Sequence, residues 1–142
     1  MNRKNSVETP RYLIDFIKKY FKIKKFVDPC PLNINFDPLK NKCALSFAWK
    51  DDTFFVNPPY SNVRKFIKYA HVQYKNHGTK IILLVKTDVI CTSYFKQIFK
   101  DAFLVFVPHR IIFPKYCNPA HFTSVIISFG FGREQTFTVA DM

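Results

Sequence analysis

The sequence predicts an α/β fold, in which strands and helices alternate along one sheet. Residues 81–85 (Ile-Ile-Leu-Leu-Val) are continuously apolar, as is typical of a strand buried on both faces. Residues 63–74 before them place apolar side chains at helical spacing. Further apolar runs at 102–107 and 122–129 are candidate strands. This rhythm of helix and strand is typical of an α/β sheet.

The remaining elements are shorter. A helix is predicted from Thr9, the expected N-cap, and Pro10, the expected first helical residue. Residues 23–27 and 53–56 are candidate short strands, and a further helix is expected over roughly 90–100. The helix after Pro10 is predicted from apolar residues at helical spacing: Leu13, Ile14, Phe16, Ile17, Tyr20 and Phe21.

Composition favours one folded domain, over residues 1–142, that binds a polyanion. The chain is 48% hydrophobic, which is ample for a core. Lys and Arg number 22 against 10 Asp and Glu, so the formal charge is +12. Such an excess favours nucleic acid or an acidic membrane surface as partner. With only three glycines, the chain lacks the common Gly-rich phosphate loops.

Several protein classes are not expected. No apolar run approaches the roughly 18 residues needed to span a bilayer, and no apolar core follows the basic N-terminus as in a signal peptide. The four cysteines contain no Cys-x-x-Cys pair and the histidines are scattered, so no metal site is predicted. A reduced, intracellular protein with no membrane partner is the simplest interpretation.

The residues Asn57-Pro58-Pro59-Tyr60 end the strand predicted at 53–56 and form a stiff corner. Each proline fixes its own φ and lacks an N–H donor, and Pro58 also forces Asn57 into an extended conformation. The corner therefore presents carbonyl oxygens beside an aromatic ring. The amide oxygen of Asn57 and the carbonyl of Pro58 suit the exocyclic amine of a planar base, and Tyr60 suits stacking on its ring.

At this point the sequence resembles the phage-type and large-DNA-virus DNA adenine N6-methyltransferases. The resemblance covers nearly the whole chain in the right order, and it couples Asn-Pro-Pro-Tyr to Asp-Pro-Cys-Pro-Leu-Asn about thirty residues upstream. It implies a shortened Rossmann-like class I methyltransferase sheet with flanking helices. The residues that carry it are Thr9-Pro10, Asp28 to Asn33, Asn35 to Asp37, Leu39, Trp49, Phe55 to Ser61, Thr87-Asp88, Arg110-Ile111 and Phe113.

The resemblance also implies a chemistry and a site. It implies methyl transfer from S-adenosyl-L-methionine to adenine N6 in double-stranded DNA, with the adenine flipped out of the duplex, and it suggests the host cell of a virus or phage. The catalytic residues implied are Asn57, Pro58, Pro59 and Tyr60. The cofactor-binding residues implied are Thr9, Pro10, Asp28, Pro29, Cys30, Asp37 and Asn57.

Other interpretations stay open at the level of sequence. Asp28 is also suited to cap a turn beside Pro29, and Thr9 to cap a helix. Arg110 is suited either to a DNA phosphate or to a carboxylate in the core. The rival functions are a catalytically inactive, methyltransferase-derived nucleic-acid-binding protein, and the same chemistry on RNA or on cytosine N4. A homodimer that completes the DNA cleft is a further possibility.

Overall fold

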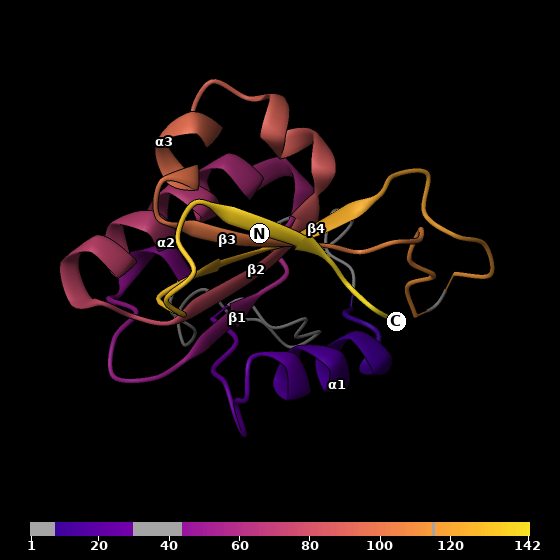
Figure 1. Ribbon diagram of the computed structural model, residues 1–142, viewed down its shortest axis with the longest axis horizontal. Coiled ribbons are helices and arrows are strands. Elements are labelled where there is room, and N and C mark those ends of the chain that lie inside the picture. The colour runs from indigo at the N-terminus through magenta and orange to yellow at the C-terminus, as the bar shows by residue number, and fades with distance from the viewer. Residues whose placement is uncertain (1–7, 30–43, 115) are drawn as a thin grey trace.

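The computed structural model describes residues 8–29, 44–114 and 116–142, and its centre is a five-stranded sheet. The strand order is β1-β2-β4-β3-β5. The strands are β1 (Phe54–Val56), β2 (Ile81–Lys86), β3 (Ala102–Phe106), β4 (Ser124–Phe129) and β5 (Thr136–Val139). Figure 1 shows the sheet between α1 on one side and α2 with α3 on the other.

The sheet mixes parallel and antiparallel pairs. β1 runs parallel to β2, and β3 runs parallel to β5. β4 is antiparallel to both of its neighbours, β2 and β3. The predicted α/β class is therefore confirmed, with strands at four of the predicted places and one antiparallel strand in the middle of the sheet.

Three α-helices and three short 3-10 helices complete the described elements. α1 spans Arg11–Tyr20, α2 spans Val63–His77 and α3 spans Phe95–Phe99. The 3-10 helices span Ala44–Ser46, Tyr60–Asn62 and Thr87–Cys91. α2, with 15 residues the longest helix in the described part of the chain, is too short and too polar to cross a bilayer.

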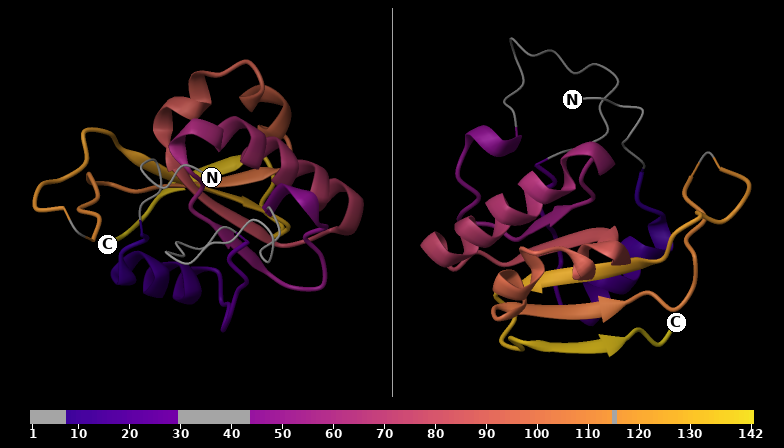
Figure 2. Two further views of the ribbon diagram at one scale, coloured as in Figure 1. Left: turned by 180° about the vertical axis from the view of Figure 1, so that it is seen from behind. Right: turned by 90° about the horizontal axis from the view of Figure 1, so that it is seen from above.

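The core forms two layers, one on each face of the sheet, and β2 contributes to both. Ile81, Leu83 and Val85 point to the layer under α2 and α3, whereas Ile82 and Leu84 point to the layer under α1. All five side chains are buried, as the continuous apolar run predicts. The helices close the two layers (Figure 2) with Phe66, Ile67, Ala70 and Ile98 on one side and Leu13 and Ile17 on the other.

The predicted start of the first helix is wrong by one residue. Pro10, with φ −59° and ψ 144°, is the N-cap, and its carbonyl accepts hydrogen bonds from the backbone N–H groups of Leu13 and Ile14. Thr9 makes no side-chain cap. Its hydroxyl is engaged elsewhere, by a hydrogen bond from Asn57.

Two other predictions are corrected. Residues 23–27 form no strand; only Val27 makes an isolated parallel bridge, to Phe54. The helix expected over roughly 90–100 is divided into Thr87–Cys91 and Phe95–Phe99. Thr92 between them is extended, with φ −91° and ψ 155°, so the helix cannot run through it.

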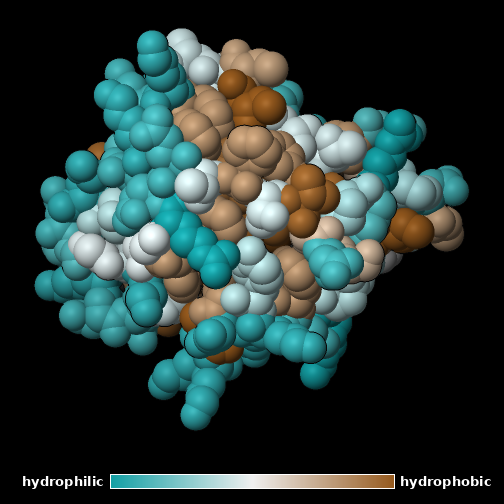
Figure 3. Space-filling model, viewed as in Figure 1, coloured by the Kyte–Doolittle hydropathy of each residue, from teal (hydrophilic) through white to brown (hydrophobic). Residues whose placement is uncertain are grey.

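β5 was not predicted, and it lies at the edge of the sheet. Its side chains are mostly exposed, with Phe137 at 66% and Val139 at 60% of their full exposure. Figure 3 shows apolar surface across the middle of the face where β5 crosses in Figure 1. An exposed edge strand of this kind lacks the buried apolar run by which the other strands are recognised.

Candidate active site

The carboxyl ends of β1 and β2 lie side by side and place the predicted corner at one edge of the sheet. The two strands are parallel, with Val56 opposite Leu83. Asn57 follows β1 directly, and Lys86 is the last residue of β2. In open α/β sheets, ligands bind in the crevice beyond this edge.

The second proline of the corner has the conformation that the sequence predicts. Pro59 is extended, with φ −58° and ψ 136°, and its carbonyl accepts a hydrogen bond from the Asn62 N–H in the 3-10 helix that starts at Tyr60. Both prolines are buried, whereas Asn57 and Tyr60 are half-buried. Among the described residues, none donates a hydrogen bond to the Pro58 carbonyl. The Pro58 carbonyl is thus left without a hydrogen-bond donor in the described part of the chain, and Pro58 lines the small cavity described below.

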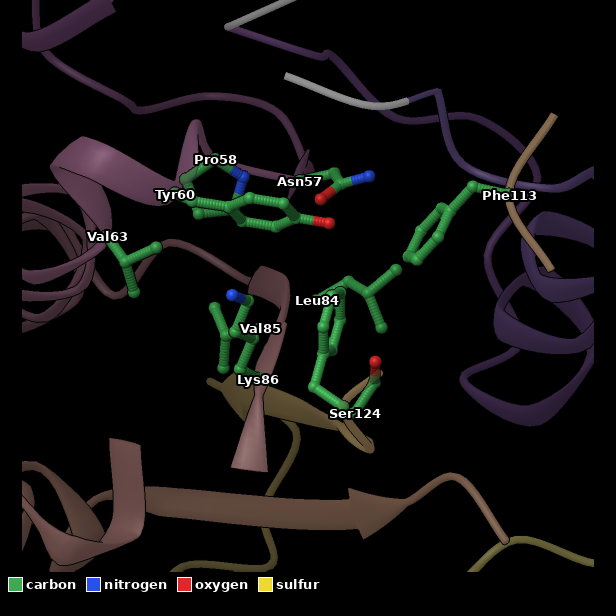
Figure 4. Close-up of a pocket in the computed structure, with 10 residues that line it drawn as sticks. Asn57, Pro58, Tyr60, Val63, Leu84, Val85, Lys86, Phe113 and Ser124 are labelled. Atoms are coloured by element: carbon green, nitrogen blue, oxygen red, sulfur yellow. The ribbon is translucent and has the colours of Figure 1, made fainter. Parts of the chain in front are cut away.

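A hydrogen bond joins Asn57 to Thr9, two predicted site residues that lie 48 positions apart in the chain. Asn57 Nδ2 donates to Thr9 Oγ1 at 3.1 Å. Figure 4 shows the result: the amide nitrogen of Asn57 points away from Tyr60, and the amide oxygen lies on the side of the Tyr60 hydroxyl. Thr9 therefore orients the amide of Asn57, a role that the sequence does not reveal.

The bridge at Val27 brings Asp28 to the same edge. The Val27 N–H donates to the Thr53 carbonyl at 2.8 Å, and the Val27 carbonyl accepts from the Phe55 N–H at 3.0 Å. Asp28 therefore follows a segment that runs parallel to β1, and it is exposed there, with Pro29 buried beside it. Cys30 and Asp37, the other predicted cofactor-binding residues, lie outside the described residues.

The corner lines a small cavity. It encloses about 230 Å³ of empty space, including its open mouth, and its lining includes Asn57, Pro58 and Tyr60 (Figure 4). A second, larger and open cavity, of about 970 Å³ including the solvent at its mouth, is lined mainly by the segment between β3 and β4. Four residues line both cavities: Tyr60, Lys86, Phe113 and Phe122.

Sequence reasoning missed Lys86 and Phe122 as site residues. The apolar run at 122–129 predicts that Phe122 begins a strand, but β4 begins at Ser124. Lys86 is the one charged residue in β2, and it stands at the end that faces the corner. A single lysine at the end of a strand of buried apolar residues is the signal in the sequence that could have indicated Lys86.

Arg110 is exposed, and among the described residues it forms no ion pair with a carboxylate. This exposure favours the interpretation in which Arg110 contacts a DNA phosphate over the one in which it pairs with a carboxylate in the core. An exposed arginine is accessible to a phosphate of the DNA backbone.

Tyr60 is held in its neutral form. Burial raises the pKa of Tyr60 to about 12, and the nearby Tyr116 hydroxyl adds to the rise. The ring therefore carries no charge at physiological pH. Tyr60 also stands nearly perpendicular to Phe122, at an interplanar angle of 82°.

The raised pKa of Tyr60 has a testable consequence for stability at high pH. The folded state holds this proton more tightly than a free tyrosine with its pKa of 10.0, so the contribution to stability is complete below pH 10 and is lost as the pH rises through about 12. The absorbance of tyrosinate is titrated against pH in the wild type and in Tyr60→Phe. The difference between the two curves should show one group with a pKa of about 12. A difference curve centred near the ordinary tyrosine value would contradict this.

Comparison with known proteins gives one family. The family model described as DNA N-6-adenine-methyltransferase (Dam) matches residues 2–121. A protein named DNA N-6-adenine-methyltransferase, from Haemophilus phage HP1 (strain HP1c1), is 28% identical over 99 residues, which cover 66% of this chain and 56% of the phage protein. The chain thus spans little more than half the length of that relative. No solved structure matches this chain.

Proposed function

Because this chain belongs to the DNA N-6-adenine-methyltransferase (Dam) family, we propose that it transfers a methyl group from S-adenosyl-L-methionine to the N6 amine of adenine in DNA. We also propose that its sheet is a shortened Rossmann-like class I methyltransferase sheet. The parallel pair of β1 and β2, with α2 between them and the functional corner at their carboxyl ends, supports this.

The observation that carries the proposed function is the orientation of the Asn57 amide. The bond from Asn57 Nδ2 to Thr9 turns the amide oxygen towards the cavity edge at Tyr60. The amide oxygen of Asn57 and the carbonyl of Pro58 then accept the two N–H bonds of the adenine amine. Pro59 stiffens the corner, and Tyr60 stacks on the adenine ring.

These hydrogen bonds favour the reaction and not merely binding. They hold the lone pair of N6 towards the methyl group, and they strengthen as positive charge develops on the nitrogen. No strong general base is needed before the attack. The oxygens of Asn57 and Pro58 are fixed in advance by Thr9 and by the two prolines, so little reorganisation accompanies the reaction.

The described residues at this edge suit S-adenosyl-L-methionine. A carboxylate at Asp28 fits a hydroxyl or ammonium group, and Thr9 and Pro10 lie beside Asn57, which places the N-terminal segment against the acceptor corner. When bound, the cofactor supplies a methyl group already activated on a sulfonium. We assign its binding to Asp28 with Pro29, to Thr9 with Pro10 and to Asn57, and we extend the assignment to Cys30 and Asp37.

Double-stranded DNA is the proposed partner, with the target adenine flipped into the corner. Extrusion from the stack costs a few kcal/mol, and stacking on Tyr60 offsets part of this. The net charge of +12 and the exposed guanidinium of Arg110 suit the phosphate backbone.

Identification of the methylated base tests the proposed function. Unmethylated DNA and RNA are incubated separately with the protein and methyl-labelled cofactor, and the products are digested to nucleosides. We expect the label in N6-methyldeoxyadenosine. Label in N4-methyldeoxycytidine or in RNA alone would show that the proposed substrate is wrong. Binding of DNA without any incorporation of label would show that the protein is an inactive DNA-binding protein and not an enzyme. Light scattering on the same sample decides whether the protein is a homodimer.

Asp28→Ala should weaken cofactor binding. The variant removes the carboxylate that directly follows the bridge residue Val27. Loss of a hydrogen bond to a charged group corresponds to about 1.5–3 kcal/mol in binding free energy, or roughly 10- to 150-fold in Kd. Calorimetric titration with the cofactor measures the change. Asp15→Ala, in the exposed part of α1, is the matched control and should bind as the wild type does. Equal affinities for wild type and Asp28→Ala would remove Asp28 from the site.

A further inference from the structure

We propose that the ammonium group of Lys86 occupies the stacking place of the target base in the DNA-free protein, and that the entering adenine displaces it onto a phosphate beside the extruded nucleotide. The inference rests on the proposed function and deepens it, because it makes Lys86 a positioning residue that favours adenine within a polynucleotide over free adenosine.

Lys86 lies where a base would stack on Tyr60. Its Nζ lies 4.4 Å from the centroid of the Tyr60 ring and 4.5 Å from that of the Phe122 ring. The two ring centroids are themselves only 5.5 Å apart. Figure 4 shows the nitrogen of Lys86 below the ring of Tyr60, on the side of Leu84 and Val85. A cation at this distance covers the ring face, so no base can stack there while the ammonium stays.

Lys86 also contributes to both cavities of the site. Lys86, Tyr60 and Phe122 line both the small cavity beside Asn57 and Pro58 and the larger cavity next to it. Side chains that line both cavities form the wall between them. Displacement of Lys86 opens this wall and joins the acceptors of the corner to the larger space, which leaves room for a base.

The contacts of the Lys86 ammonium group favour its displacement. Among the described residues, the ion pairs of the protein are made by Asp101 with His71 and Lys75, and none involves Lys86. Aromatic rings hold its ammonium in place of a carboxylate. Such contacts are modest and nondirectional, so they break more readily than a buried ion pair. The charge stays available to a phosphate.

Specificity for polynucleotides follows from this exchange. Free adenosine that enters the corner must break the contacts of Lys86 with both rings. It has no phosphate that could form a new contact with the displaced ammonium group. A nucleotide within DNA brings phosphates on both sides, which accept the displaced ammonium. Lys86 therefore penalises the nucleoside and is neutral or favourable for DNA.

Adenosine binding by Lys86→Ala tests the inference without turnover. NMR titration of the protein with adenosine should show binding about 5- to 30-fold tighter than in the wild type, since no cation has to leave the rings. Lys80→Ala is the matched control, because Lys80 lies next to the other end of β2 with its Nζ over Phe131 at 5.7 Å. It should leave adenosine affinity unchanged. Lys86→Gln removes the charge but keeps most of the side-chain length, and it replaces Lys86→Ala if the alanine variant is unstable.

Duplex DNA provides the second measurement. The plot of log Kobs against log salt should become shallower by about 0.9 in Lys86→Ala, the value of one phosphate contact in B-DNA. Lys86→Arg should keep the wild-type slope. The inference is overturned if Lys86→Ala binds adenosine no tighter than the wild type, including no detectable binding by either, or if its salt slope is unchanged. Wild-type protein that methylates no DNA would overturn the proposed function instead, while the adenosine titration would still decide the role of Lys86.

Discussion

Asn57→Ala should lower kcat for methylation by at least about 100- to 1,000-fold, the usual effect of removing one preorganised polar contact to a developing charge. The variant loses the amide oxygen that we assign to the adenine amine. Asn57 is only half-buried, so the fold should survive the change. Methyl incorporation into DNA gives the rate, and a thermal unfolding curve confirms that the protein is folded.

Thr9→Val is the control that separates the amide from its anchor. It keeps Asn57 but removes the oxygen that accepts the Nδ2–H at 3.1 Å. The amide then loses this hydrogen bond, and we expect a smaller loss of kcat than in Asn57→Ala. If Asn57→Ala methylated DNA at the wild-type rate, the amide of Asn57 would have no part in the reaction.

Trp49→Ala should cost about 3–5 kcal/mol in the free energy of unfolding, the usual range for a buried tryptophan. Trp49 is fully buried, its ring is stacked on Phe54 of β1 with centroids 5.6 Å apart, and its Nε1–H donates to the Ala44 carbonyl at 2.9 Å. Its backbone N–H also donates to Gln73 of α2. The indole also contacts Phe66 and Tyr69 of α2, so it holds the segment before β1 against the helix that follows the corner.

Urea unfolding measures this loss, and an exposed aromatic residue provides the control. Phe137→Ala, at a side chain that is 66% exposed on β5, should change stability by no more than about 1 kcal/mol. Equal losses for the two variants would mean that Trp49 does not hold these elements together.

The elements that the sequence predicts well are those whose signals are local. The apolar run at 81–85 needs no partner to be recognised, and it is β2. α2 ends where Gly78 adopts the left-handed conformation, with φ 68°, which only glycine enters without strain. The elements that failed depend on distant partners. β5 is short and exposed, and only its pairing with β3 makes it a strand. Residues 23–27 have the composition of a strand, but they pair with the sheet through a single bridge, at Val27.

The site divides in the same way. The stiffness of the Asn57-Pro58-Pro59-Tyr60 corner follows from the residues themselves, and its place at a strand end is confirmed. The bond from Asn57 to Thr9 joins residues 48 positions apart, so no local pattern reveals it. Lys86 was missed because a lysine at a strand end is usually a solvated side chain, and only the placement of Tyr60 and Phe122 around it gives it a role.

The central claim is that the corner binds the amine of a flipped adenine. A crystal structure of the protein with a cofactor analogue and a duplex that contains its methylated sequence tests this most directly. We predict adenine N6 within about 2.7–3.2 Å of both Asn57 Oδ1 and the Pro58 carbonyl oxygen, with the adenine ring on Tyr60. A target adenine that remains stacked in the duplex, or that binds with N6 turned away from these two oxygens, would contradict the claim.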